Sequence, residues 1–209
     1  MSFEQQNNVE KQILEQGRER QIALLKKLSN LFKDNNIKWW LTGGHAIEAN
    51  IASDSAYRYH GDIDMIMPIK EIEKVKSILT KEGIEFINDQ PFLIVIMENG
   101  EKMADVLFYE FTENGTAILN TKDDIGRDIN YRPSVFDQTS REYFGAQVFT
   151  VRPELIALQL RNSRTPRPKD IQDLEQLDKL IDPEILADID LGKPYVTPEE
   201  VAKYKNKKD

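Results

Sequence analysis

Two aspartates separated by a single residue, Asp62 and Asp64, are the side chains with the clearest chemical potential in this sequence. They stand in an apolar run, and alternation along a strand puts both carboxylates on one face, with Ile63 and Met65 on the core face. Carboxylates this close repel each other unless a cation neutralises them or one keeps its proton. Magnesium, which takes one or two carboxylates together with water and substrate phosphates, resolves the repulsion most simply. The alternative is a solvated strand edge with two surface carboxylates.

Two glycines, Gly43 and Gly44, precede this pair and separate the apolar run 37–41 from a segment that can form a helix. A backbone without side chains can approach a phosphate closely, and the first amides of the following helix attract anions. The stretch 39–67 therefore predicts a strand, a glycine turn, a helix and a second strand that carries the carboxylates. Alone, the glycine pair fits a simple tight turn equally well.

A third carboxylate, Asp105, lies within the apolar run 103–108. The preceding Asn99 and Gly100 form a strong hairpin signal, so strands are predicted at 92–97 and 102–111, paired antiparallel. Asp105 can join Asp62 and Asp64 only if its strand lies beside theirs with the same face up. The alternative for Asp105 is a strand-end residue that forms a salt bridge.

The order of these residues resembles the signature of the aminoglycoside and lincosamide nucleotidyltransferases, within the polymerase-β-like nucleotidyltransferase superfamily. The usual pattern is Gly-Gly-Trp-Ala-x-Asp followed by Arg-x-His-x-Asp-Ile-Asp, with a third carboxylate on a neighbouring strand. The matching residues here are Gly43, Gly44, Ala46, Arg58, His60, Asp62, Ile63, Asp64 and Asp105. Two positions depart from the pattern, because His45 replaces the tryptophan and Glu48 the aspartate. The resemblance covers about two-thirds of the chain and, beyond it, the segment 167–170.

The resemblance implies an α+β nucleotidyltransferase fold, with a mixed sheet flanked by helices. Residues 1–150 would form the catalytic domain and 151–209 a helical C-terminal region. The implied reaction is a magnesium-dependent transfer of a nucleoside monophosphate, AMP from ATP, to a hydroxyl of a small molecule, with release of pyrophosphate. The implied acceptor is an aminoglycoside or lincosamide antibiotic. Alternatives are a nucleotidyltransferase that modifies a protein or tRNA, and an inactive nucleotide-binding module.

By this resemblance, Asp62, Asp64 and Asp105 would bind the metal and carry out catalysis, with Asp105 completing a second metal site or acting as general base. The nucleotide would contact four residues: Gly43, Gly44, Arg58 and Lys169. For Arg58, an ion pair with an acidic residue is favoured over a phosphate contact.

The remaining polar residues of the motif have more than one interpretation. His60 is expected to orient the loop before the aspartate strand. His45 could touch nucleotide or acceptor, or simply lie in the first helical turn, and the two histidines lack partners for a zinc site. Glu48 is a candidate ligand for a cationic acceptor. Asp170, next to Lys169, fits a helix start motif of related transferases and also the ordinary preference of helix N-termini for acids.

Composition limits the class of protein. The chain has 209 residues, a formal net charge of −8 and no cysteine, which excludes disulfides and thiolate metal sites. The polar N-terminus and the lack of a long apolar run predict a cytoplasmic protein with no membrane partner. An acidic chain lacks the overall positive charge that favours binding to nucleic-acid phosphates, whereas an acidic pocket would attract a cationic small molecule.

The elements that would support this site follow from apolar periodicity. Helices are predicted at 9–33, continuous or broken at Gly17, and at 70–82. Loops and one further hairpin are expected between 114 and 151. Helices at 154–162 and 169–180 follow, the second with Ile171, Leu174, Leu177 and Ile181 facing inwards. Further helix starts are predicted at Asp182 and Thr197.

Overall fold

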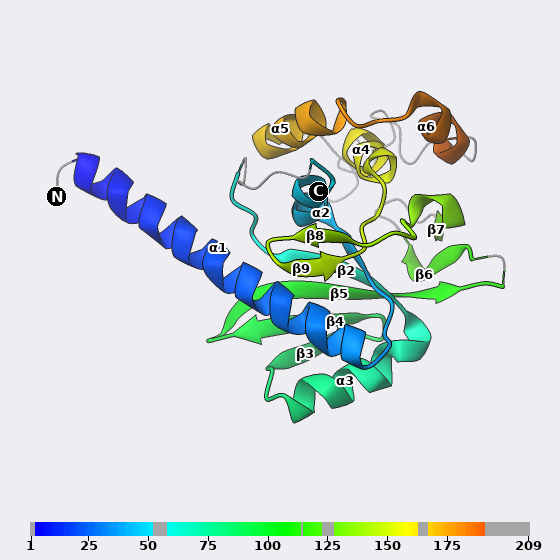
Figure 1. Cartoon of the computed structure of the whole chain (residues 1–209), viewed down its shortest axis with the longest axis horizontal. Coiled ribbons are helices and arrows are strands. Elements are labelled where there is room, and N and C mark those ends of the chain that lie inside the picture. Colours follow the sequence, from blue (N-terminus) through cyan, green and yellow to red (C-terminus); the bar gives the residue numbers. More distant parts are fainter. Residues whose placement is uncertain (1–2, 52–57, 114, 123–127, 163–166, 191–209) are drawn as a thin grey trace, which may run out of the picture.

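The structure, a computed structural model, describes residues 3–51, 58–113, 115–122, 128–162 and 167–190 (Figure 1). Within these residues the main sheet has seven strands. The order is β1-β2-β5-β4-β3, and β6 pairs with β5 and with β7. The strands are β1 Trp40–Thr42, β2 Ile63–Pro68, β3 Phe86–Gln90, β4 Leu93–Glu98, β5 Glu101–Phe111, β6 Ala117–Lys122 and β7 Asp128–Tyr131. The predicted mixed sheet with flanking helices is confirmed, since β2 and β5 run parallel and other pairs antiparallel.

Helix α1, Phe3–Asp34, is continuous through Gly17 and longer than predicted. Its C-terminal half places Leu25, Leu28 and Phe32 in the core, all fully buried. The N-terminal turns extend away from the sheet in Figure 1. One glycine does not break the helix, because its intrinsic cost is only about 1 kcal/mol.

The predicted strand, glycine turn, helix and strand are all present. Strand β1 is short, and α2, Gly43–Ile51, begins directly at the glycine pair. Strand β2 turns Ile63, Met65 and Met67 inwards, each fully buried, as alternation predicts. It ends where the single-turn helix η1, Ile69–Glu71, leads into α3, Ile72–Lys81.

Strand β5 is central to the arrangement of the carboxylates. It pairs in parallel with β2, with Asp64 opposite Asp105. On its other side it pairs antiparallel with β4 through a tight turn, in which Asn99 has φ 53° and Gly100 φ 79°. Positive φ at both positions is what the Asn-Gly pair allows in a two-residue hairpin, so the hairpin prediction is confirmed.

Three strands were missing from the sequence prediction. Strand β3 is an exposed edge strand of mostly polar residues, so its pattern is weak. Strands β6 and β7 form a second hairpin within 114–151, where loops and only one hairpin were expected. Ala117, Leu119 and Tyr131 of this hairpin are buried because β6 extends the edge of β5, a tertiary contact that the local sequence does not show.

A second, two-stranded sheet confirms the hairpin expected around Gly145. It consists of β8, Arg141–Tyr143, and β9, Ala146–Val148, joined through Phe144 and Gly145, both with positive φ. The short helix η2, Pro133–Val135, precedes it. Helix α1 packs against β9.

The C-terminal helices are α4, Pro153–Asn162, α5, Pro168–Leu177, and α6, Pro183–Asp190. They lie together at the top of Figure 1, and α2 lies between them and the sheet. The inward orientation predicted for Ile171 is wrong, since it is 51% exposed, and α5 instead buries Asp170 and Asp173. Asp182 caps α6 by accepting a hydrogen bond from the Glu184 amide. The helix start predicted at Thr197 lies outside the described residues.

In the part of the chain that the structure describes, no helix is both long and apolar enough to span a bilayer.

Candidate active site

Three aspartates meet at the start of the parallel pair β2 and β5. Asp62 immediately precedes β2, and Asp64 stands opposite Asp105 across the two strands. One carboxylate oxygen from each lies within 4.8 Å of those of the other two. The sequence did not show whether the strand of Asp105 lies beside that of Asp62 and Asp64. In the structure the two strands pair, and this brings Asp105 to the other two aspartates. A set of close, acceptor-only oxygens suits a hard divalent cation, so these residues fit magnesium.

The cluster changes the proton affinity of its central member. Burial of the carboxyl group, followed by the charges of Asp62 and Asp105, raises the pKa of Asp64 to about 7. Lys102 and Lys169 act in the opposite direction and do not overcome these effects. Removing water from adjacent carboxylates without a cation is costly, and holding a proton on Asp64 reduces that cost.

Lys102 supplies a cation from the protein itself. Its Nζ forms ion pairs with Asp62 and, at 2.9 Å, with Asp105 Oδ2. Partial burial disfavours the ammonium form, but the hydrogen bonds to the two aspartates raise the pKa of Lys102 above its usual value. No signal in the sequence assigned Lys102 to the site, because in a regular strand its side chain would face away from Asp105.

The glycine turn touches the carboxylates directly. Gly43 has φ +62°, and a Cβ on it would lie 2.2 Å from Asp64 Oδ2. A Cβ on Gly44 would lie 2.0 Å from Nδ1 of His60. Both glycines are therefore required by contact with the motif that follows, and Gly43 also by its left-handed backbone. The first residue of α2 therefore lies next to Asp64.

A buried polar network lies behind this turn. Glu48 Oε1 is 3.0 Å from His60 Nε2, and Glu48 Oε2 accepts a hydrogen bond of 2.7 Å from the Tyr143 hydroxyl. His45 lies between Tyr143 and Gln21, with its ring nitrogens 2.9 and 3.2 Å from their oxygens. Gln21 also donates to the backbone oxygen of His60. The network thus links α1, α2 and β8 to the loop before Asp62, as expected for the orienting role of His60.

Burial governs the charges of the network. Burial, then the charge of His60, lowers the pKa of His45 to about 3, so its ring is neutral at pH 7. Burial alone would raise the pKa of Glu48, but hydrogen bonds from His60 and Tyr143 hold it below its usual value. Glu48 is fully buried and engaged within the protein.

The two histidines were expected to lack partners for a zinc site, and Glu48 places a third possible donor beside them. Donor atoms of His45, Glu48 and His60 lie within 4.8 Å of one another, close enough to hold an ion. These donor atoms already contact one another or Tyr143 and Gln21, so the three residues form a structural network.

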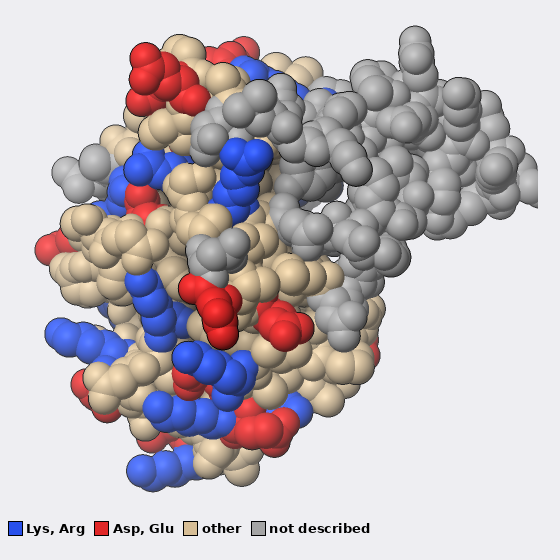
Figure 2. All heavy atoms as spheres, turned by 90° about the vertical axis from the view of Figure 1, so that its right-hand side faces the viewer, with Lys and Arg blue, Asp and Glu red and all other residues tan. Residues whose placement is uncertain are grey.

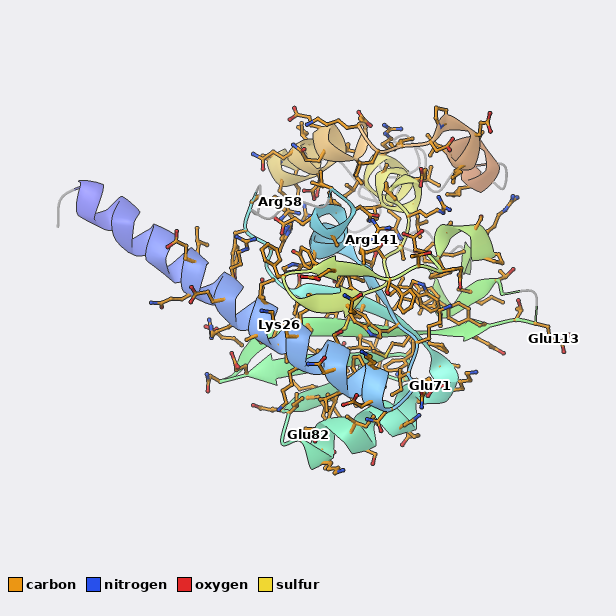
Figure 3. All side chains as sticks on the ribbon, viewed as in Figure 1. Lys26, Arg58, Glu71, Glu82, Glu113 and Arg141 are labelled. Carbon is orange, nitrogen blue, oxygen red and sulfur yellow. The ribbon has the colours of Figure 1, made fainter. Side chains whose placement is uncertain are left out.

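Arg58 forms the ion pair favoured for it. Its Nε and Nη2 donate to the two carboxylate oxygens of Asp173, each at 2.6 Å, and Nη1 donates to the backbone oxygen of Tyr59. In Figure 3, Arg58 lies on the loop before β2, below α5. Asp173 was missed because a single acid on an amphipathic helix looks like part of its exposed face. The paired guanidinium also lies beside Gly44, 3.0 Å from where a Cβ would stand.

The start of α5 approaches the same site. Lys169 is close enough that its charge lowers the pKa of Asp64. Asp170, 1% exposed, accepts a hydrogen bond of 2.9 Å from the Arg167 amide and so caps the helix. The plain helix-start role of Asp170 is therefore the one observed, whereas a phosphate contact of Lys169 stays a prediction.

The charged side chains do not form a broad basic surface where they can be seen. On the face in Figure 2, the described Lys and Arg side chains are interspersed with Asp and Glu. Such a surface gives little of the long-range attraction on which non-specific nucleic-acid binding depends.

Fold and site together define a class, the nucleotidyltransferases. The family model of aminoglycoside-2''-adenylyltransferases matches residues 24–177, and the chain belongs to this family. It is therefore an enzyme that transfers a nucleotidyl group. No curated protein sequence matches the chain significantly.

Two solved structures share the fold. One is the lincosamide antibiotic adenylyltransferase LnuA bound to lincomycin, with 17% identity and a TM-score of 0.59 over 74% of this chain and 94% of that chain. The other is ANT(2")-Ia in complex with adenylyl-2"-tobramycin, with 15% identity and a TM-score of 0.64 over 91% of this chain and 99% of that chain. At this level of identity the likeness concerns the fold.

Proposed function

We propose that this enzyme transfers AMP from ATP to a hydroxyl group of an aminoglycoside or lincosamide antibiotic, releases pyrophosphate and requires magnesium. The observation that carries the proposal is the meeting of Asp62, Asp64 and Asp105 at the glycine turn. The family assignment and the antibiotics in the two similar structures support the choice of acceptor. Function depends on the site more than on the fold, so the acceptor requires its own test.

The three aspartates would hold magnesium, which when bound neutralises phosphate charge and stabilises the attacking and leaving oxygens. The protein's own part is to hold these carboxylates in one place on rigid strands, without rearrangement at each turnover. Asp105 would serve either as a metal ligand or as the general base for the acceptor hydroxyl.

The triphosphate would lie along the glycine turn. Gly43 and Gly44 leave the backbone bare there, and the first amides of α2 attract the anion. Lys169, at the start of α5, adds a positive charge close to Asp64. Arg58 contributes to this site by fixing α5 through Asp173. Positioning of the reacting groups is the main contribution that such an enzyme makes.

The acceptor proposal also draws on charge. A formal net charge of −8 favours a cationic substrate such as an aminoglycoside over a polyanion. Glu48 would not bind a cationic acceptor, because it is fully buried in contact with His60 and Tyr143. Absence of cysteine suits the cytoplasm, where we propose that the enzyme acts.

The test is release of pyrophosphate by the purified protein with ATP and magnesium, across a panel of aminoglycosides and lincosamides. Asp64→Asn serves as the blank, since it removes a ligand and preserves side-chain size. We expect release that depends on one drug class and a product heavier by one adenylyl group in mass spectrometry. No release with any drug, from a protein that still binds ATP, would contradict the proposed acceptor.

A further inference from the structure

Lys102 reaches the three aspartates because of an irregularity in β5. Between β4 and β5 the register shifts, with Ile96 opposite Ala104 and Met97 opposite Lys102. An advance of one residue along β4 therefore corresponds to two residues along β5. This irregularity is a β-bulge, with Met103 as the extra residue. Met103 and Ala104 are both buried. The bulge therefore puts Lys102 on the same face as Asp105, where a regular strand would place residues three apart on opposite faces.

The two residues that pair with Lys102 are both proposed metal ligands. Its Nζ pairs with Asp62 and with Asp105 Oδ2. The side chain is 44% exposed, so it reaches the cluster from the solvent side and has room to turn outwards. A lysine ammonium is a compact charge on a flexible stem, which suits a contact that can be released.

We propose that Lys102 is a counter-ion built into the site, which balances Asp62 and Asp105 until a metal–nucleotide complex arrives. The inference rests on the proposed function, since it concerns the same carboxylates. A free divalent cation must displace the ammonium and is repelled by it. A magnesium–ATP complex carries net negative charge, so the displaced ammonium can pair with its phosphates. Lys102 therefore opposes binding of the free ion and favours binding of the complex.

This role predicts two effects of opposite sign. Without the ammonium, free metal should bind more tightly and the metal–nucleotide complex more weakly. A lysine that only stabilised the fold would weaken both when removed. A lysine that only attracted phosphate would leave the affinity for free metal unchanged.

The experiment measures binding of Mn²⁺, alone and with a non-hydrolysable ATP analogue, by calorimetry and by the electron paramagnetic resonance signal of the free ion. The variant is Lys102→Met, with Lys102→Gln as a second neutral replacement and Lys102→Arg to keep the charge. Lys76→Met is the matched control, because Lys76 forms its ion pair with Glu73 within α3, on a different element from the three aspartates. Melting curves establish that each variant is folded.

For Lys102→Met and Lys102→Gln we expect affinity for free Mn²⁺ to rise on the order of tenfold, and affinity for the Mn²⁺–nucleotide complex to fall by a similar factor. Lys102→Arg and Lys76→Met should resemble the wild type. Unchanged or weaker binding of free Mn²⁺ by both neutral variants overturns the proposal for Lys102. If the wild type binds no Mn²⁺ with or without nucleotide, the metal site of the proposed function is wrong, and the role of Lys102 falls with it.

Discussion

Asp64 is where the electrostatic cost of this site is concentrated. It stands between the glycine turn and β5, with Asp62 and Asp105 nearby, and its pKa is raised to about 7. A carboxyl group with a raised pKa in the folded state binds its proton more tightly there than in the unfolded chain. Its favourable contribution is full at low pH and is lost as pH rises through the folded pKa.

The metal-free protein should therefore lose stability through Asp64 as pH rises from about 4 to 7, the interval between its ordinary pKa and the folded value. Asp64→Asn has no such titration. In the presence of a chelator, we expect the variant to unfold at higher urea concentration than the wild type at pH 8. At pH 5 the difference should shrink or reverse.

Magnesium provides the control for that measurement. It should stabilise the wild type at pH 8 and not the variant, because binding to the native state shifts the unfolding equilibrium. A difference between wild type and variant that does not change with pH would contradict the assignment of the raised pKa to Asp64.

Gly43 offers a second test at the residue scale. Gly43→Ala places a methyl group at 2.2 Å from Asp64 Oδ2, on a backbone with φ +62°. The left-handed conformation alone costs about 1–2 kcal/mol for a residue with a Cβ, and the contact displaces Asp64. We expect loss of stability by urea titration together with loss of nucleotide binding.

Gly61→Ala is the matched control for this change. Gly61 lies on the same loop as His60, and a Cβ there meets nothing within 4 Å. Its variant should retain both stability and nucleotide binding. Equal effects of the two substitutions would mean that the contact with Asp64 is unimportant.

At the scale of elements, the Arg58–Asp173 pair fixes α5 to the loop before β2. Both side chains are largely buried, at 13% and 5% exposed, and the pair is bidentate. Removing one partner leaves an uncompensated charge, which typically costs about 3–5 kcal/mol. We expect Arg58→Met and Asp173→Asn each to destabilise the protein and to weaken nucleotide binding, through displacement of Lys169.

A double-mutant cycle measured by urea unfolding tests this coupling. The two losses should combine to less than their sum, since the second substitution removes the charge that the first left unpaired. Strictly additive losses would show that the two side chains act independently. Arg161→Met, which breaks an exposed pair with Asp178, should cost little by comparison.

The elements that sequence predicted well are those with a strong local signal. The glycine turn, the Asn99-Gly100 hairpin and the apolar face of β2 follow from backbone preference and alternation. Strands β3, β6 and β7 were missed, because their residues are polar or depend on pairing with a neighbour. The exposed position of Ile171 could not be predicted either, since Asp173 faces inwards only to meet Arg58, which is distant in sequence.

The same division applies to the candidate site. Types and spacing of residues identified Asp62, Asp64 and Asp105, whereas their meeting depends on the parallel pairing of β2 with β5. The position of Lys102 beside the aspartates depends on a β-bulge in β5, which the sequence pattern does not predict. The network of His45 and Glu48 could not be predicted, because it depends on contacts with Gln21 and Tyr143, which lie on elements far apart in the sequence.

At the scale of the whole molecule, the sheet and the C-terminal helices share one core. Leu155, Ile156 and Leu160 of α4, and Leu177 of α5, belong to the same buried cluster as the strands. The division into a catalytic domain, 1–150, and a helical C-terminal region, 151–209, stays a prediction. Because the two regions share one core, they should unfold together. We expect a single unfolding transition, coincident by fluorescence of Trp39 and Trp40 and by circular dichroism.

Both halves should respond together to ligand as well. Magnesium with a non-hydrolysable ATP analogue should raise the midpoint of that one transition, and not in Asp64→Asn. Two separated transitions, of which only one moved with nucleotide, would instead support independent domains.

The parallel pairing of β2 with β5 also bears on how the chain folds. Asp64 and Asp105 are brought together by strands with α3 and the β3–β4 hairpin between them in sequence. Such a contact closes a long loop, and pairings of this kind form slowly compared with helices and hairpins. The carboxylate cluster therefore does not exist in partly folded chains that lack this pairing. Metal binding, followed in time during refolding, would report when β2 and β5 have paired.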